Sequence, residues 1–312
     1  YEPQIAEGIT LTGQTIIRTA EKVVNETIAK FLGETEIVDR VIAIDTDSVY
    51  ITAKDIIDKY KPNNPVDFLD KLGSKLIEPA FEEGFNVLSE RTNAYSNRMV
   101  MAREAIADRA IWTAKKRYIL NVHNNEGVQY AEPKIKMMGI EAIKSSTPQP
   151  CREAMKALFK VIMTGSEENT QAAIAAFKEH FNSLRPEAVA FPRGVSDITK
   201  WSSPDTIYTK GTPMHVRASL LYNYSIKKNN ICNLYEPIYN GDKMKFIYMM
   251  VPNPLQENIY GFKDAFPDEL GYNKYIDYNK QFQKTFTDPI DSILTSIGWT
   301  SEKHLDLQSF FC

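Results

Sequence analysis

Two aspartates lie two positions apart inside an otherwise apolar, mostly β-branched segment. Residues 41–51 read Val-Ile-Ala-Ile-Asp-Thr-Asp-Ser-Val-Tyr-Ile. Positions i and i+2 share one face of a strand, and a hairpin that bends at the aspartates would also present Asp45 and Asp47 together. Two such carboxylates resist joint ionisation unless a cation lies between them, and Mg²⁺ prefers oxygen ligands. The segment therefore predicts β structure with a candidate metal site, and an ordinary hairpin tip is the alternative.

The composition indicates a globular protein of about two domains. The chain has 312 residues, of which 43% are hydrophobic and 25% charged, and a net charge of −3. Any nucleic-acid surface must therefore be a local patch. The three cysteines lack metal-ligand spacing and suit a reducing compartment. The sequence has neither an apolar run of roughly 18 residues nor a signal peptide, so we expect a cytoplasmic protein without a membrane partner.

Hydrophobic periodicity predicts an α+β fold. Helical spacing indicates helices at residues 9–32, ended by Gly33, and at residues 66–88. Strands are expected at residues 99–106, 111–122 and 128–136, with a hairpin turn at 123–127. Helices beside an antiparallel sheet are typical of the α+β class.

The character of the chain changes after Gly139. Helices are predicted at residues 149–164 and 167–184, the first capped by Ser146-Thr147-Pro148. Frequent proline and glycine then predict irregular structure through Pro213, and residues 260–299 carry mixed helical and loop signals. The second part of the chain is therefore expected to be mainly helical.

Positive charge gathers in two segments. Residues 134–160 carry six bases against two acids, and residues 200–228 carry five bases against one acid. Aromatic side chains are interleaved with these bases: Tyr130, Trp201, Tyr208, Tyr222 and Tyr224. This pattern predicts a surface for a phosphate backbone, with the solvated face of ordinary helices as the alternative.

Three shorter constellations refine this prediction. Lys115-Lys116-Arg117-Tyr118 opens a predicted strand, where alternation would place Lys116 and Tyr118 on one face; a lysine-protected edge strand is the alternative. Arg103-Glu104 lies in a predicted apolar strand, so Glu104 needs a partner, either Arg103 or another cation. The third set offers cations and hydroxyls suited to phosphates, or a lysine-rich approach to a helix: Lys134, Lys136, Lys144, Ser145 and Ser146.

Together and in this order, these segments resemble the C-terminal part of family B DNA polymerases, most of all those of T-even-type tailed phages. Asp45-Thr46-Asp47-Ser48 resembles motif C, and residues 115–118 resemble the duplex-binding K-K-R-Y element. Further segments that resemble this subgroup are residues 101–107, 131–134, 144–148, 211–213 and 215–217. The resemblance covers essentially the whole chain.

The resemblance implies a role for each matching residue. Asp47 matches the ligand of two catalytic Mg²⁺ ions, Asp45 matches its companion, and Glu104 matches a nearby palm carboxylate. Lys116 and Tyr118 match residues that touch the primer-template DNA, supported by Lys115 and Arg117. Residues 1–139 would be the C-terminal part of the palm and residues 140–305 the thumb, with dNTP as the other substrate.

The last residues, 306–312, resemble a peptide that binds a sliding clamp. Leu307 supplies an aliphatic anchor, and Phe310 and Phe311 supply an aromatic pair. Such apolar groups dock into a pocket on a partner. A C-terminus folded back onto its own core is the alternative.

The chain departs from the family in two ways. Ala43-Ile44 stands where motif C usually has Tyr-Gly. The motif A aspartate, motif B and the 3′–5′ exonuclease domain are missing, and the chain starts with Tyr1 rather than Met. We therefore expect a fragment, a processed product or one part of a split protein. Its partner would be an N-terminal polymerase part with the exonuclease, the fingers and the rest of the palm, and this chain alone should not polymerise.

Other functions fit less well. A haloacid-dehalogenase-type phosphatase could use Asp45 as nucleophile, but it needs a later acidic pair near a Gly-Asp, and Gly241-Asp242 is followed by Lys-Met-Lys. Nothing further supports a D-x-D glycosyltransferase. The alternative from another class is a non-catalytic DNA- and clamp-binding subunit descended from a polymerase, which the Ala43-Ile44 departure favours.

Overall fold

The computed structural model describes residues 2–303, and the chain has the α+β fold that the sequence predicts. It divides into two compact units. Unit 1 comprises Tyr1–Ala110 and Leu120–Lys136, and unit 2 comprises Ile111–Ile119 and Met137–Cys312. None of the helices in the described part of the chain has the length and apolar character needed to cross a bilayer.

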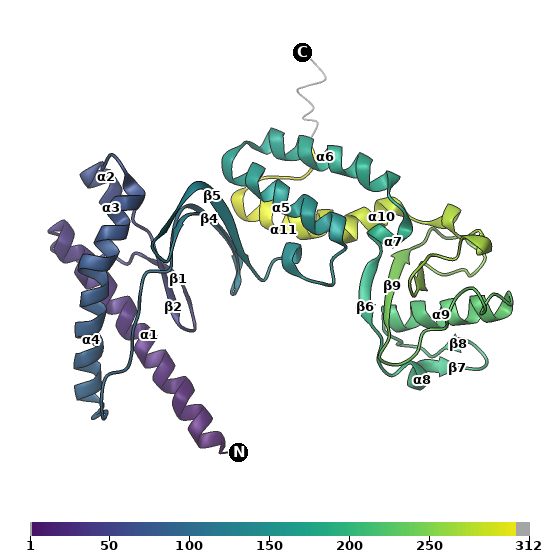
Figure 1. Ribbon diagram of the computed structural model, residues 1–312, viewed down its shortest axis with the longest axis horizontal. Helices are drawn as coiled ribbons and strands as arrows, with labels where there is room; N and C mark the ends of the chain where they lie inside the picture. The colour runs from purple at the N-terminus through teal and green to yellow at the C-terminus, as the bar shows by residue number, and fades with distance from the viewer. Residues whose placement is uncertain (1, 304–312) are drawn as a thin grey trace, which may run out of the picture. The chain divides into compact units, whose positions relative to one another are not determined.

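Unit 1 is built on the long helix α1 (Pro3–Leu32), which crosses α4 (Glu78–Arg91) in Figure 1. α1 ends at Gly33, as predicted, because Gly33 adopts a left-handed φ of 68° and donates its N–H to the carbonyls of Ala29 and Lys30. The side chains of α1 that reach the core recur every four residues, as on one face of a helix. The buried cluster consists of Ala20, Val24, Ile28, Leu32, Ile56, Leu72, Phe81 and Phe85.

The second predicted helix of unit 1 is interrupted by a π-helical turn. It runs through α3 (Pro65–Leu72), the π turn Gly73–Ile77 and then α4. Asn64 starts it by accepting a hydrogen bond from the N–H of Asp67, as an N-cap residue does. A shorter helix, α2 (Lys54–Tyr60), precedes it and buries Ile56.

The two-aspartate segment forms an antiparallel hairpin of β1 (Val41–Asp45) and β2 (Ser48–Ile51). Ala43 pairs with Tyr50, Ile44 with Val49 and Asp45 with Ser48. The segment is thus the hairpin that was one of the two predicted arrangements, and its bend falls at the aspartates.

A second sheet has the strand order β3-β4-β5. Its strands are β3 (Ala105–Ala114), β4 (Arg117–Asn125) and β5 (Val128–Met138). The turn predicted between the last two strands is confirmed at Glu126-Gly127, where both residues have positive φ.

Two strand predictions were wrong. The expected strand at residues 99–106 is absent, since residues 99–104 have no regular secondary structure and β3 begins at Ala105. The backbone N–H of Arg103 donates instead to the Glu78 carboxylate, 2.9 Å away, and therefore does not join a sheet. The expected strand at residues 111–122 is two strands, because Lys115-Lys116 form a turn and Lys116 adopts a left-handed φ of 60°.

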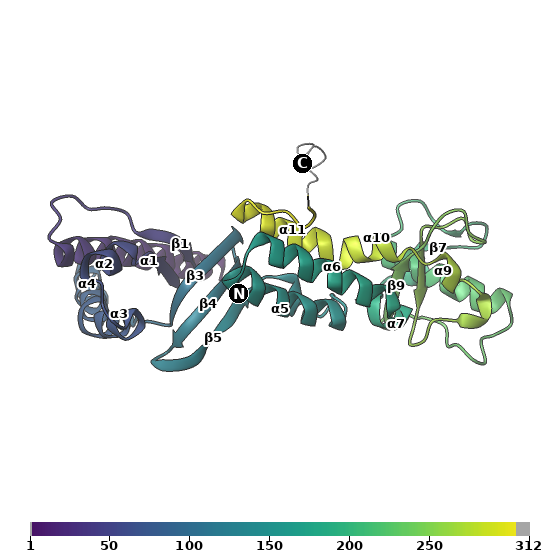
Figure 2. The ribbon, with the colours of Figure 1, turned by 90° about the horizontal axis from the view of Figure 1, so that it is seen from above.

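Unit 2 begins with a helical layer. α5 (Gln149–Thr164) and α6 (Glu167–Ser183) form close to their predicted bounds. Figure 2 shows α6 running beside α10 (Tyr278–Phe282), which continues through a π turn (Gln283–Thr287) into α11 (Asp288–Leu294). Aromatic rings join these helices, with the rings of Phe177 and Phe286 4.7 Å apart. The N-cap residue of α5 is Pro148, which lies in the segment predicted to cap this helix, and no side chain donates or accepts a capping hydrogen bond there.

The rest of unit 2 packs a helix against a small sheet. The sheet has the antiparallel order β10-β9-β6, from β6 (Phe191–Gly194), β9 (Lys243–Tyr248) and β10 (Ile259–Phe262). Helix α9 (Met214–Lys228) lies so close that a Cβ on Gly261 would fall 2.6 Å from the Ala218 carbonyl oxygen. Besides β6, the region expected to be irregular holds only short elements: α7 (Pro186–Val189), α8 (Ile198–Trp201), β7 (Ser202–Ser203) and β8 (Ile207–Tyr208).

Candidate functional site

The tip of the β1–β2 hairpin carries the two predicted metal ligands. Asp45 is the last residue of β1, and Asp47 lies exposed in the turn. The carbonyl of Asp45 accepts hydrogen bonds from the N–H of Asp47 and, at 3.1 Å, from the hydroxyl of Ser48. Thr46, between the aspartates, has a φ of +47°, which is unusual for a β-branched residue and costs about 1–3 kcal/mol. Strain of this kind gathers at functional sites, which makes the tip a candidate one.

The base of the hairpin is held by Arg40, a residue for which the sequence alone predicts no role. Its side chain is buried, and Nη2 lies 2.6 Å from the carboxylate of Glu34 and 3.2 Å from that of Asp55. Its backbone N–H donates to the side-chain oxygen of Asn25 in α1, and its carbonyl accepts the N–H of Thr52 after β2. Arg40 therefore fixes the start of β1 to α1 and α2.

Asp39 also connects the base of the hairpin to α1. Its Oδ1 accepts hydrogen bonds from the N–H of Val41 and from the side-chain amide of Asn25, both at 3.0 Å. These donors stabilise the ionised form, so they hold the pKa of Asp39 below its ordinary value of 3.8.

This lowered pKa predicts acid sensitivity at the hairpin base. The stabilisation is fully present above the unfolded-state pKa and is lost as the pH falls through the folded-state pKa. Asp39→Asn should therefore lose less stability than the native chain between about pH 6 and about pH 3, as urea unfolding at a series of pH values would measure. Asp58→Asn, on the exposed face of α2, is the control; equal pH profiles for native and Asp39→Asn chains would contradict the prediction.

The hairpin fits part of a magnesium ligand set. Carboxylate oxygens are the hard donors that Mg²⁺ prefers. Among residues 2–303, however, no three or more Asp, Glu, His or Cys side chains come together as a metal site. Asp45 and Asp47 are therefore the two carboxylates that the hairpin tip itself offers to a metal ion.

Glu104, the third predicted acidic residue, forms an ion pair with Lys136. Its neighbour Arg103 pairs instead with Asp70 of α3. The sequence required a cation for Glu104 and left open which one, and the structure places Lys136 there. The prediction that both residues lie within a strand is wrong, because they precede β3. Lys136, which was predicted to contact a DNA phosphate, thus forms an ion pair with the carboxylate of Glu104.

The K-K-R-Y element spans the turn between β3 and β4. Lys115 and Lys116 form the turn and are exposed, Arg117 opens β4, and Tyr118 is buried with its ring 6.2 Å from that of Trp112. The predicted sharing of one strand face by Lys116 and Tyr118 is wrong, because Lys116 lies in the turn rather than in the strand.

Arg117 and Lys144 share one carboxylate, that of Glu141. Arg117 Nη2 lies 2.7 Å from one oxygen and Lys144 Nζ 2.8 Å from the other. Glu141 opens a short 3-10 turn, Glu141–Ile143, whose neighbour Ile140 and member Ala142 are fully buried. In the sequence, the only signal for Glu141 is that it is an acid within a basic segment.

The remaining predicted DNA contacts lie nearby in the chain. Lys134 places its ammonium 4.1 Å from the centre of the Tyr130 ring, a cation–π contact. Ser145 is exposed, and the carbonyl of Ser146 accepts a hydrogen bond from Arg193 at 2.9 Å. The predicted clamp-binding residues Leu307, Phe310 and Phe311 lie outside the described residues.

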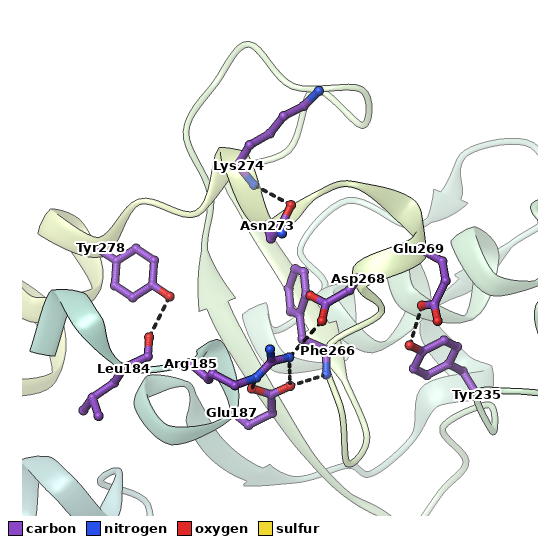
Figure 3. Close-up of polar contacts among 10 residues, drawn as sticks. All are labelled: Leu184, Arg185, Glu187, Tyr235, Phe266, Asp268, Glu269, Asn273, Lys274 and Tyr278. Carbon is purple, nitrogen blue, oxygen red and sulfur yellow. Dashed lines mark hydrogen bonds and ion pairs between the residues drawn. The ribbon is translucent and has the colours of Figure 1, made fainter.

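Unit 2 also contains a pocket of about 360 Å³ between the end of α6 and the 3-10 turns Asp268–Leu270 and Asn273–Tyr275. Figure 3 shows its polar contacts: Arg185 lies 3.1 Å from Glu187 and 2.8 Å from Asp268, and the Tyr278 hydroxyl donates to the Leu184 carbonyl. Hydrogen bonds to Glu187 and then to Asp268 raise the pKa of Arg185 above its ordinary value. Since the charge of Arg185 is paired with two carboxylates, that charge does not indicate an anionic ligand in the pocket.

Comparison with known proteins identifies what the chain is similar to. No family model matches the sequence. The chain is 32% identical over 331 residues to the DNA-directed DNA polymerase of Escherichia phage RB69 and 29% identical over 329 residues to that of Enterobacteria phage T4. Both matches cover the whole chain, which spans 36% of the length of each relative. The chain therefore corresponds in sequence, along its whole length, to a C-terminal part of the family B DNA polymerases of T4-type phages.

Proposed function

We propose that this chain works as the C-terminal part of a DNA-directed DNA polymerase. The observation that carries the proposal is its similarity, from end to end, to the phage polymerases. The strained hairpin that bears Asp45 and Asp47 supports it, because that hairpin lies where motif C was predicted. In this proposal residues 1–139 belong to the palm, residues 140–305 to the thumb and residues 306–312 to a clamp-binding tail.

The chain's own residues would position metal and nucleic acid. Two Mg²⁺ ions would supply activation of the primer 3′-hydroxyl and neutralise charge on the dNTP. Asp47 would bind them and Asp45 would support it, on a hairpin whose base Arg40 holds fixed. Glu104 would contribute only indirectly, because its carboxylate forms an ion pair with Lys136. The basic turn at Lys115 and Lys116 would neutralise phosphates of the primer-template without reading its sequence.

The proposed polymerase needs further parts. An N-terminal part would supply motifs A and B, the fingers and the exonuclease domain, and the fact that the chain spans only 36% of its relatives agrees with this. Leu307, Phe310 and Phe311 would attach the assembly to a sliding clamp.

Primer extension tests the proposal. The isolated chain should bind primer-template DNA but not extend it, and mixing it with a part that carries motifs A and B should give template-dependent extension. Extension by the chain alone would overturn the predicted dependence on a second part. An assembly that binds DNA but never extends it would overturn the proposed catalysis.

That last result would favour the alternative, a non-catalytic DNA- and clamp-binding subunit. The observation in its favour is Ala43-Ile44, which replaces the Tyr-Gly usual in motif C. In the hairpin Ile44 is 40% exposed, so the position before Asp45 presents an aliphatic surface in place of a flexible glycine.

A further inference from the structure

The K-K-R-Y turn is fastened to the segment Gly139–Lys144 at two points. The first is a backbone contact: Gly139 has a φ of +65°, and a Cβ there would lie 2.2 Å from the carbonyl oxygen of Lys116. Only glycine allows the two backbones to approach so closely. The second is the ion pair between Arg117 and Glu141.

Glu141 is well placed to act as the fixed member of this contact. Its side chain is 19% exposed, and its backbone lies between the fully buried Ile140 and Ala142. Its two oxygens are divided between Arg117 and Lys144, so it forms a network rather than one surface pair. A pair in a network of this kind is worth more than an isolated exposed pair.

Arg117 depends on Glu141 more than its neighbours do. Its side chain is 33% exposed, and its Nε is buried without a hydrogen-bond partner among the described residues. Lys115 and Lys116, in contrast, are exposed on the turn itself. The residues of the element therefore differ: Lys115 and Lys116 are exposed on the turn, whereas Arg117 is held by the carboxylate of Glu141.

We propose that Glu141 is a positioning residue, which holds the turn of residues 115–118 against the segment of residues 139–144 through Arg117. Lys115 and Lys116 then meet DNA phosphates from a fixed turn, and Arg117 and Lys144 serve the protein rather than the DNA. The inference rests on the proposed function of the turn in binding DNA.

The proposal predicts that Glu141→Gln weakens DNA binding, whereas relief of charge repulsion alone would strengthen it. Glu141→Gln removes a negative charge beside a DNA-binding turn, which by itself would tighten binding to DNA. Loss of the anchor should instead weaken binding of a primer-template by about fivefold, measured by fluorescence anisotropy at several salt concentrations. Glu132→Gln, which removes an exposed carboxylate on β5, is the matched control and should leave affinity unchanged or slightly higher.

A double-mutant cycle separates anchoring from direct contact. If Arg117 acts through Glu141, Arg117→Gln and the double variant should each lose the same affinity as Glu141→Gln. A further loss in the double variant would mean that Arg117 binds DNA itself and would overturn the proposal. Tighter binding by Glu141→Gln, with a steeper salt dependence, would overturn it too, because Glu141 would then be competing with phosphate.

Amide hydrogen exchange without DNA provides a readout that does not depend on the proposed function. In Glu141→Gln, exchange at residues 115–118 should accelerate by about tenfold or more, while exchange at residues 121–125 stays unchanged. If the native chain does not bind DNA, the proposed DNA contact fails, and this measurement still decides whether Glu141 holds the turn. Unchanged exchange overturns the inference. Glu141→Asp, which keeps the charge but withdraws it from Arg117, replaces Glu141→Gln if that variant does not fold.

Discussion

Replacing Asp47 by alanine is expected to slow primer extension by the assembled polymerase by about a hundredfold to a thousandfold. Metal-bound transition-state charge is worth several kcal/mol, and each 1.36 kcal/mol is about tenfold in rate. Affinity for primer-template DNA should stay within about twofold, because contacts to phosphates, and not this carboxylate, hold the duplex. Single-turnover extension and anisotropy measure the two quantities separately.

Two further variants sharpen this test. Asp58→Ala removes an exposed carboxylate from α2 in the same unit and should leave the extension rate unchanged. Asp45→Ala should slow primer extension less than Asp47→Ala does if Asp45 is only the companion of the metal ligand. Undiminished extension by Asp47→Ala, with DNA binding intact, would show that the hairpin does not catalyse and would favour the binding-subunit alternative.

Arg40→Ala should lower the free energy of unfolding by about 3 kcal/mol. The change leaves a cavity where a fully buried side chain stood, and it removes the counter-charge of Glu34 and Asp55. Both carboxylates are partly exposed, 29% and 53%, so water can solvate them and the cost falls at the lower end for a broken buried pair. Urea unfolding followed by circular dichroism measures the loss.

The same variant should loosen the hairpin base. The N–H of Thr52 donates to the carbonyl of Arg40, so its amide exchange should accelerate in Arg40→Ala. Arg18→Ala, on the exposed surface of α1, is the control and should change stability by less than about 0.5 kcal/mol. Arg40→Met keeps most of the volume and should recover part of the loss; equal stability of Arg40→Ala and Arg18→Ala would contradict this account.

Elements with a sustained local pattern could be predicted from the sequence. The apolar residues of α1 recur every four positions and a glycine follows them, and α5 has the bounds that were predicted for it, residues 149–164. Local spacing carries this information because the same side chains that define the helical face also form the core.

The break between β3 and β4 could not be read in the same way. It depends on Lys116 adopting a left-handed conformation, which a sequence usually signals with glycine or asparagine. Here the turn is held by Gly139, which follows it by more than twenty positions. The residues around the turn therefore look, in the sequence, like one uninterrupted segment with β propensity.

The candidate site shows the same difference between local and distant residues. Asp45 and Asp47 are neighbours in sequence and could be found there, whereas the residues that hold the site come from distant positions. Arg40 reaches Asn25 and Asp55, and Glu141 reaches Arg117, in each case across at least fifteen residues. A single sequence offers no signal that pairs such residues, since each of them has ordinary surface character when taken alone.

The π-helical turn at Gly73–Ile77 has a consequence for chain length. Such a turn holds one residue more than α-helix would need, and an α-helix rotates by about 100° for each residue. Deleting a single residue here would therefore allow regular α-helix to form while Phe81 and Phe85 keep their place in the buried cluster. Inserting a residue would exceed what the turn absorbs and would rotate both rings by about 100°, so between residues 65 and 91 this chain should tolerate the loss of one residue better than the gain of one.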